Sequence, residues 1–107
     1  ETVVTLLTDD AWLTMPPEPY EYQGPAAIGR FLDDRARRRG VNLVLVPTQA
    51  NRQPAFGCYV PDAHTPVAHA YGLLVLTLRD GDISAITWFG DRSVMARFGL
   101  PRTLPLR

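Results

Sequence analysis

The sequence has no net charge, no lysine and a single cysteine, and these shortages limit what the chain can do. Eleven arginines balance eleven acidic residues, so the chain lacks the basic field by which nucleic-acid-binding proteins attract phosphate, and we expect no direct contact with nucleic acid. We interpret the exclusive use of arginine as the codon bias of a GC-rich genome. The lone Cys58 excludes an internal disulfide framework. No apolar run approaches the roughly 18 residues of a membrane span, which favours a cytoplasmic protein without membrane contact.

The composition is that of one globular domain, which we assign to residues 1–107. Hydrophobic residues make up 46% of the chain and charged residues 21%, a balance typical of folded proteins rather than disordered ones. A domain of this length buries a modest fraction of its surface, which favours association with a partner. The chain starts at Glu1 in the middle of a pattern and without an initiator methionine, so we expect it to be cut from a longer protein.

A helix is predicted from Pro25 to the region of Gly40. Proline suits the first helical turn, and Ile28, Phe31 and Leu32 recur on one face. Arginines fill the last turn, where they complement the helix dipole, and glycine suits a left-handed cap. We interpret the arginine cluster as a solvated helix end, with docking of an acidic partner as the alternative.

The residues before this helix give weaker signals. Residues 2–7 read as the last turns of a helix or as a short apolar lead-in. Ala11 to Met15 alternates as a strand does, and Pro16-Pro17 should end that strand. Residues 16–23 are then predicted to form a loop.

After Gly40 the apolar residues change to the period of strands. Strands are predicted over residues 41–46, 55–60, 67–78 and 83–90. Asp80-Gly81 favours a two-residue type I′ turn, so the last two strands should form a hairpin. The pairs expected on one face, unless a bulge shifts them, are Leu78–Ile83, Leu76–Ala85, Leu74–Thr87, Gly72–Phe89 and Ala70–Asp91. The order of elements predicts an α+β domain with helices against one face of a curved sheet, whose mouth makes a pocket.

A thiol and an imidazole form the first candidate reactive pair. If Val60 pairs with Val67 across the loop, Cys58 faces His69 on one side of the sheet and Tyr59 falls on the pocket face. A thiol beside an imidazole is a minimal activated nucleophile. No third group clearly orients the histidine, however, and buried cysteines are usually inert, so we interpret Cys58 as a packing residue.

Two further polar groups invite a reactive role. Asp62, His64 and His69 are metal-binding residue types, but the loop that holds them shows no recognised ligand spacing, and we predict no metal site. Asp91 could serve as a base. Capping of the turn after the last strand, or pairing with an arginine, suits this aspartate better.

Three short motifs, in this order, resemble those of a known superfamily. They are Leu6-Leu7-Thr8-Asp9-Asp10-Ala11, then Tyr22-x-Gly24-x-x-Ala27-Ile28-x-x-Phe31, and finally Trp88-Phe89-Gly90-Asp91. With them, nearly the whole chain resembles a SnoaL-like domain of the nuclear transport factor 2-like superfamily. The resemblance implies a cone-shaped, curved antiparallel or mixed sheet with helices on its concave face, a cystatin-like α+β roll. Members usually begin with a longer first helix, so part of that helix is expected to be missing here.

A narrower resemblance rests on three other segments. They are Met15-Pro16-Pro17-Glu18-Pro19, the run from Val46 to Phe56, and Ala96-Arg97-Phe98-Gly99-Leu100-Pro101. Together they resemble the C-terminal domain of extracytoplasmic-function sigma factors. This resemblance implies that the promoter-recognition domains of a sigma factor and RNA polymerase are the partners, and that the domain modulates transcription.

The superfamily resemblance also bears on catalysis. Isomerase members hold a carboxylate base near the end of the first strand, and here that position is Met15, whose thioether accepts no proton in the working pH range. The position of their second acid falls near Leu74. The resemblance therefore implies a regulatory domain with an apolar cavity, without catalytic residues, cofactor or metal. We expect a small apolar ligand to contact Met15, Tyr22, Phe31, Tyr59, Leu74, Thr87, Phe89 and Asp91, with Tyr59 and Asp91 as the polar contacts.

Two other classes of function stay open. The chain could be a small ketosteroid-isomerase-like or polyketide-cyclase-like enzyme with Asp91 or His69 as base. It could also be a structural module that forms a homodimer through His69, Tyr71 and Trp88.

Overall fold

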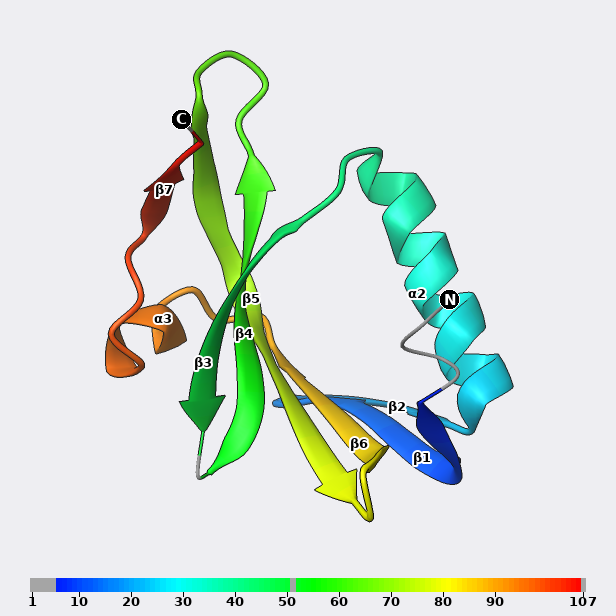
Figure 1. Cartoon of the computed structure of the whole chain (residues 1–107). Coiled ribbons are helices and arrows are strands. Elements are labelled where there is room, and N and C mark those ends of the chain that lie inside the picture. The colour runs from blue at the N-terminus through cyan, green and yellow to red at the C-terminus, as the bar shows by residue number, and fades with distance from the viewer. Residues whose placement is uncertain (1–5, 51, 107) are drawn as a thin grey trace.

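One strongly bent β-sheet forms the body of the domain (Figure 1). The structure, a computed structural model, describes residues 6–50 and 52–106. Its elements are β1 (Leu7–Met15), β2 (Glu18–Gln23), α2 (Pro25–Arg39), β3 (Val44–Ala50), β4 (Gln53–Pro61), β5 (Val67–Arg79), β6 (Asp82–Phe89), α3 (Val94–Arg97) and β7 (Thr103–Pro105). The strand order is β2-β1-β6-β5-β4-β3, with β7 on the start of β5; β1 and β6 run parallel and the other pairs antiparallel. The predicted α+β fold with a curved mixed sheet is confirmed.

The first strands differ most from the sequence prediction. The predicted lead-in over residues 2–7 lies mostly outside the described residues. Residues 18–23, predicted as part of a loop, form β2, which pairs with β1 as an edge strand. The segment has polar side chains and Pro19, so its sequence lacks the alternation typical of a strand. An edge strand that faces water tolerates both features.

Helix α2 is confirmed at both ends. Pro25 occupies its first turn, and Gly40 ends it with a φ of 75° and an N–H that donates to the carbonyl of Ala36 at 3.0 Å. The helix buries Ile28, which belongs to a cluster with Leu13 and Ile86 of the sheet. This cluster fixes α2 on the inner side of the bend, over β1 and β2 at one end of the sheet (Figure 1).

The β5–β6 hairpin begins as predicted and then departs from the predicted register. Asp80 and Gly81 have φ values of 55° and 88°, as a type I′ turn requires, and Leu78 pairs with Ile83. Ser84 is then left unpaired as a bulge, and its hydroxyl donates to the carbonyl of Thr77 at 3.2 Å. The predicted pairs beyond the bulge are therefore wrong. Leu76 pairs with Ile86, Leu74 with Trp88, Val75 with Thr87 and Leu73 with Phe89, so Gly72–Phe89 and Ala70–Asp91 do not form.

The β4–β5 pairing also corrects a prediction. Val60 pairs with His69 rather than with Val67, and Cys58 lies opposite Gly72. The predicted facing of Cys58 and His69 is therefore wrong. The loop between β4 and β5 is shorter than expected, because the N–H of Asp62 donates to the carbonyl of Val67 at 2.8 Å and so extends the hairpin beyond the strands.

The two faces of the sheet carry separate cores. The inner face holds the cluster under α2. On the outer face, where Figure 1 shows α3 and β7, one cluster contains Leu73 and Val75 and another contains Tyr59 and Met95. Helix α2 lies on the concave face as expected, whereas the short α3 packs on the opposite face. No helix among the described residues is long and apolar enough to cross a membrane.

Candidate ligand-binding site

The structure has a groove on the outer face, between the sheet and α3. Its volume is about 390 Å³, and it is half-open to solvent. The groove is lined by Ala50, Gln53, Leu73, Val75, Thr87, Phe89, Val94, Arg97 and Phe98. We call this space the outer groove. Volumes of about 300 to 1,000 Å³ are typical of small-molecule sites.

The floor of the outer groove is apolar because of strand alternation. Leu73 and Val75 point to the same face of β5, and both are buried. The bulge at Ser84 turns Thr87 and Phe89 of β6 to this face as well, opposite these two residues. The wall comes from α3, where the spacing of four residues between Val94 and Phe98 puts both side chains on one side.

A second lobe of about 340 Å³ continues from the first. Phe89, Val94 and Arg97 line both lobes, and the second lobe adds Pro16, Pro17, Asp91 and Ser93. This lobe lies at the end of β1, directly after Met15. Met15 itself is only 7% exposed.

The polar groups of the outer groove are few. Among the described residues that line the first lobe, they are the carboxamide of Gln53, the hydroxyl of Thr87 and the guanidinium of Arg97. The carboxamide oxygen of Gln53 accepts a hydrogen bond from the Thr77 hydroxyl at 3.4 Å. Within the described chain, no ion pair includes Arg97. The first lobe therefore carries one positive charge on apolar walls.

Asp91 is held by the turn in which it lies. Its Oδ1 accepts hydrogen bonds from the Ser93 N–H at 3.0 Å and from the Ser93 hydroxyl at 2.8 Å. These bonds, helped by the charge of Arg97, hold the pKa of Asp91 below its usual range. A carboxylate of lowered pKa is a weak base at neutral pH, so the geometry supports the capping role.

The structure brings three of the eight predicted ligand-contacting residues together in the two lobes. These are Thr87, Phe89 and Asp91. Tyr22, Phe31 and Leu74 instead pack on the inner-face cluster, with the two rings stacked at 4.5 Å between centroids. Tyr59 is fully buried in the outer core, where its hydroxyl donates to the carbonyl of Pro101 at 2.7 Å. Met15 is buried beside the second lobe.

Sequence reasoning missed the contribution of α3. Val94, Arg97 and Phe98 line the groove, but four helical residues give too short a period to recognise. The one available signal was the pair Val94 and Phe98, which are four residues apart.

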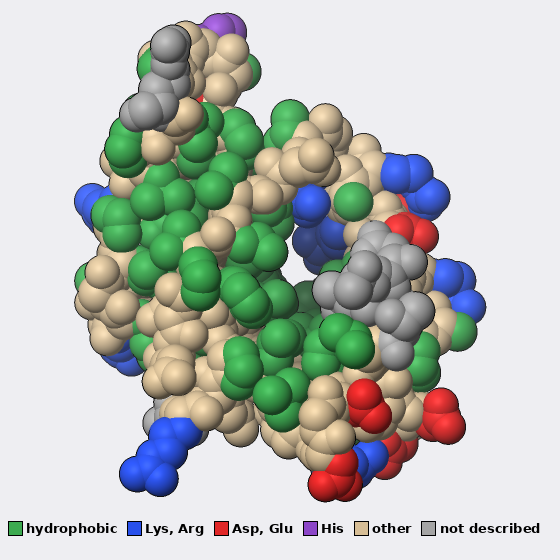
Figure 2. All heavy atoms as spheres, in the orientation of Figure 1, with side chains coloured by type: hydrophobic (Ala, Val, Ile, Leu, Met, Phe, Trp, Pro, Cys, Tyr) green, Lys and Arg blue, Asp and Glu red, His purple; other side chains and the backbone are tan. Residues whose placement is uncertain are grey.

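A second hollow lies on the inner side of the bend. Figure 2 shows an opening between α2 and the sheet, bordered by apolar side chains and by arginine at its rim. Trp88 belongs to this face of the sheet, where it contacts Tyr71 at 5.5 Å between ring centroids.

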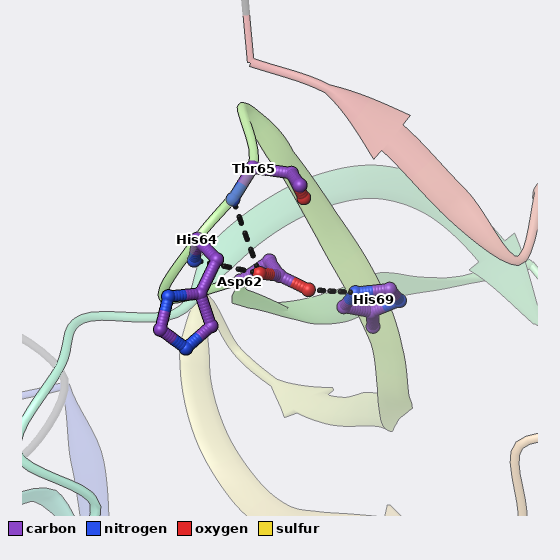
Figure 3. A network of polar contacts seen from close by, with 4 residues as sticks. All are labelled: Asp62, His64, Thr65 and His69. Atoms are coloured by element: carbon purple, nitrogen blue, oxygen red, sulfur yellow. Dashed lines mark hydrogen bonds and ion pairs between the residues drawn. The ribbon is translucent and has the colours of Figure 1, made fainter.

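The β4–β5 loop holds the clearest polar network (Figure 3). Asp62 accepts hydrogen bonds from the N–H groups of His64 and Thr65 through Oδ1, and its Oδ2 lies 2.8 Å from Nε2 of His69. These bonds lower the pKa of Asp62 to about 2. Burial raises the pKa of the Cys58 thiol to about 11, so that thiol is protonated at neutral pH. In the described ranges, no three His, Cys, Asp or Glu side chains are placed to share a metal ion.

Solved structures match the fold. A de novo designed protein with a curved β-sheet aligns with a TM-score of 0.67 and 13% identity over 90% of this chain and 75% of its own. An NTF2-like protein of unknown function from Cytophaga hutchinsonii aligns with a TM-score of 0.60 and 16% identity over 82% of this chain and 81% of its own. A candidate polyketide cyclase from Sinorhizobium meliloti aligns with a TM-score of 0.56 and 17% identity over 79% and 76% of the two chains.

Sequence comparison adds nothing to this result. No protein-family model matches the chain, and no curated protein matches it in sequence. At such low identities structural similarity establishes the fold and leaves the activity open. The chain thus has the cone-shaped α+β fold of NTF2-like proteins, with a curved and unclosed mixed sheet.

Proposed function

We propose that this chain is a non-catalytic, ligand-binding regulatory domain that binds a small apolar molecule in the outer groove. We further propose that it acts as the C-terminal domain of an extracytoplasmic-function sigma factor, in the cytoplasm, where it modulates transcription initiation by RNA polymerase.

One observation carries the non-catalytic assignment. Among the described residues no Asp, Glu or His side chain is buried, and the side chain at the end of β1 is the thioether of Met15. Proton transfer beside a carbonyl needs an acceptor in a site that excludes water, with a pKa near the working pH. Leu74 is apolar too, and it packs on the cluster under α2. Asp91 is exposed and firmly ionised, so it does not supply the missing base.

The arrangement of three sequence segments supports the sigma-factor assignment. Pro16 and Pro17 belong to the first segment that resembles those sigma factors, Ala50 and Gln53 to the second, and Arg97 and Phe98 to the third. All six residues line the two lobes of the outer groove. Three segments that are far apart in sequence thus meet at one groove, as expected if the resembling proteins share this groove.

An isomerase assay separates this proposal from the enzymatic alternative, which the polyketide cyclase neighbour favours. The chain is incubated with a β,γ-unsaturated ketosteroid, and formation of the conjugated enone is followed by absorbance. We expect no rate above that of buffer, because no carboxylate or imidazole is buried in the part of the chain that the structure describes. Turnover that is lost in Asp91→Asn or in His69→Gln would establish an enzyme and overturn the proposal.

The sigma-factor assignment is tested by the gene and by transcription. Promoter-recognition helices encoded on the 5′ side of the Glu1 codon would support it, and their absence would overturn it. In a reconstituted transcription reaction with that full-length protein, Phe98→Asp should change promoter output, because a charge on the groove wall opposes an apolar ligand or partner. Leu45→Asp, at an exposed position of β3 that lines neither lobe, is the matched control.

A further inference from the structure

Arg97 stands out among the residues of the outer groove. It lines both lobes, and among the described residues it is the only charged side chain in the lining of the first lobe. The remaining polar groups there, Gln53 and Thr87, are neutral. A ligand in the first lobe therefore meets one cation against an apolar floor.

We propose that the outer groove selects apolar monocarboxylates. This inference rests on the proposed ligand-binding function and names the ligand class for that same groove. The carboxylate contacts the guanidinium of Arg97, and the hydrocarbon body lies over Leu73, Val75 and Phe89. A planar guanidinium offers a carboxylate two parallel N–H···O bonds, and it gives up hydration more readily than an ammonium group.

The guanidinium of Arg97 is not paired with Asp91, its acidic neighbour, in the described part of the chain. Asp91 lines only the second lobe, and no ion pair joins it to Arg97 within the part of the chain that is described. Both hydrogen bonds from Ser93 are made to Oδ1 of Asp91, which keeps this carboxylate at its own turn. The negative charge of the second lobe also steers a carboxylate toward the first.

The dimensions of the groove set the size of the acid. About 390 Å³ of half-open space suits a medium-length alkyl chain or one or two rings, and a longer body would continue past Val94 into the second lobe. Because Leu73 and Val75 are buried and apolar, a second charge on the ligand would have no partner at the floor.

The test compares two probes of the same length, decanoate and decan-1-ol, on the chain of residues 1–107. Binding is followed by amide chemical shifts and by calorimetry. We expect decanoate to bind about tenfold more tightly than decan-1-ol, and Arg97→Gln to remove that difference. Arg92→Gln, an exposed arginine of the same connection that does not line the groove, should leave it unchanged. Both substitutions are on the surface, and matched thermal unfolding confirms that both variants fold.

The outcomes separate the two proposals. Equal affinity for both probes, unaffected by Arg97→Gln, would overturn the carboxylate proposal and leave an apolar ligand site in place. If Arg92→Gln removed the preference for decanoate to the same extent as Arg97→Gln, the carboxylate proposal would also be overturned, because the preference would then depend on net charge alone. Binding of neither probe, with no shifts at the groove, would overturn both the carboxylate proposal and the ligand-binding function.

Discussion

Replacement of Gly72 by alanine tests whether the sheet bends as the structure has it. A Cβ atom added at Gly72 would lie 2.4 Å and 2.5 Å from two carbons of the Trp88 indole and 2.7 Å from the carbonyl oxygen of Phe89. Non-bonded carbon atoms normally stay about 3.5 to 4.0 Å apart, so the overlap is about 1 Å. The indole is a rigid ring and the carbonyl is backbone, and neither can turn aside freely.

The cost of Gly72→Ala follows from this overlap. Overpacking of a well-packed site costs about 1 to 3 kcal/mol, and occasionally more. Because backbone must move along with the ring, we expect the upper end of this range, about 3 kcal/mol. For a domain of this size that loss lowers Tm by about 10 °C or more. Displacement of Phe89, which lines both lobes, should also weaken decanoate binding.

Gly57→Ala is the matched control. A Cβ atom at Gly57 meets the methyl ends of Leu100 at 2.7 Å and Met95 at 3.2 Å, which are the far ends of flexible side chains, and it lies 3.3 Å from a carbon of the Tyr59 ring, which needs to shift by only a few tenths of an ångström. Because alanine loses less backbone entropy than glycine on folding, it stabilises a strand by about 0.5 to 1 kcal/mol, and we expect the free energy of unfolding to change by close to zero. Urea unfolding of both variants gives the comparison. Equal destabilisation, or a neutral Gly72→Ala, would refute the contact between Gly72 and Trp88.

Three further predictions concern single polar groups. Tyr59→Phe removes the bond to the Pro101 carbonyl and should cost about 1 kcal/mol in urea unfolding. Most of the binding to the groove should be retained, because the Ala70–Arg102 bond and the pairing of β7 with β5 still hold the segment after α3. The pKa of Asp62 is lowered from its ordinary 3.8 to about 2, mainly by the hydrogen bond from the His64 N–H and next by the one with His69. The contribution of Asp62 to folding stability is therefore complete above pH 4 and is lost as the pH falls toward 2. Asp62→Asn should abolish this acid dependence, and a pH series of unfolding midpoints checks it. Asp91→Asn removes a negative charge beside Arg97 and should tighten decanoate binding about threefold by calorimetry; weaker binding would contradict the assigned roles.

The elements that could be predicted from sequence are those with strong local signals. Helix α2 has proline at its start, glycine at its end and an apolar face between them, and the Asp80-Gly81 turn determines a hairpin by its backbone angles. The elements that were missed, β2, α3 and β7, depend on tertiary contacts. Helix α3 has four residues, too few to be stable alone, and it forms because Met95 is buried against the sheet.

The site was harder to predict than the fold because a single bulge decides it. Leu74 and Thr87 were expected to pair and therefore to share a face. The unpaired Ser84 moves the register by one residue, and a shift of one residue exchanges the faces of a strand. Thr87 and Phe89 consequently face the outer groove, whereas Leu74 faces the inner core with Tyr22 and Phe31. A serine in a strand is an ambiguous signal, since it also fits a regular ladder.

The wall of the outer groove depends on the residues that follow it. Tyr59 donates to the carbonyl of Pro101, the N–H of Ala70 donates to the carbonyl of Arg102 at 2.7 Å, and β7 then pairs with β5. These contacts hold the C-terminal segment, and α3 is too short to keep its position without them. A ligand that packs on Phe98 adds contacts to this wall and so stabilises α3 together with the segment through β7, by an amount set by its affinity. Under the proposed function, occupancy of the groove would therefore be coupled to β7 and its pairing with β5, and such coupling is what the proposed regulatory role requires.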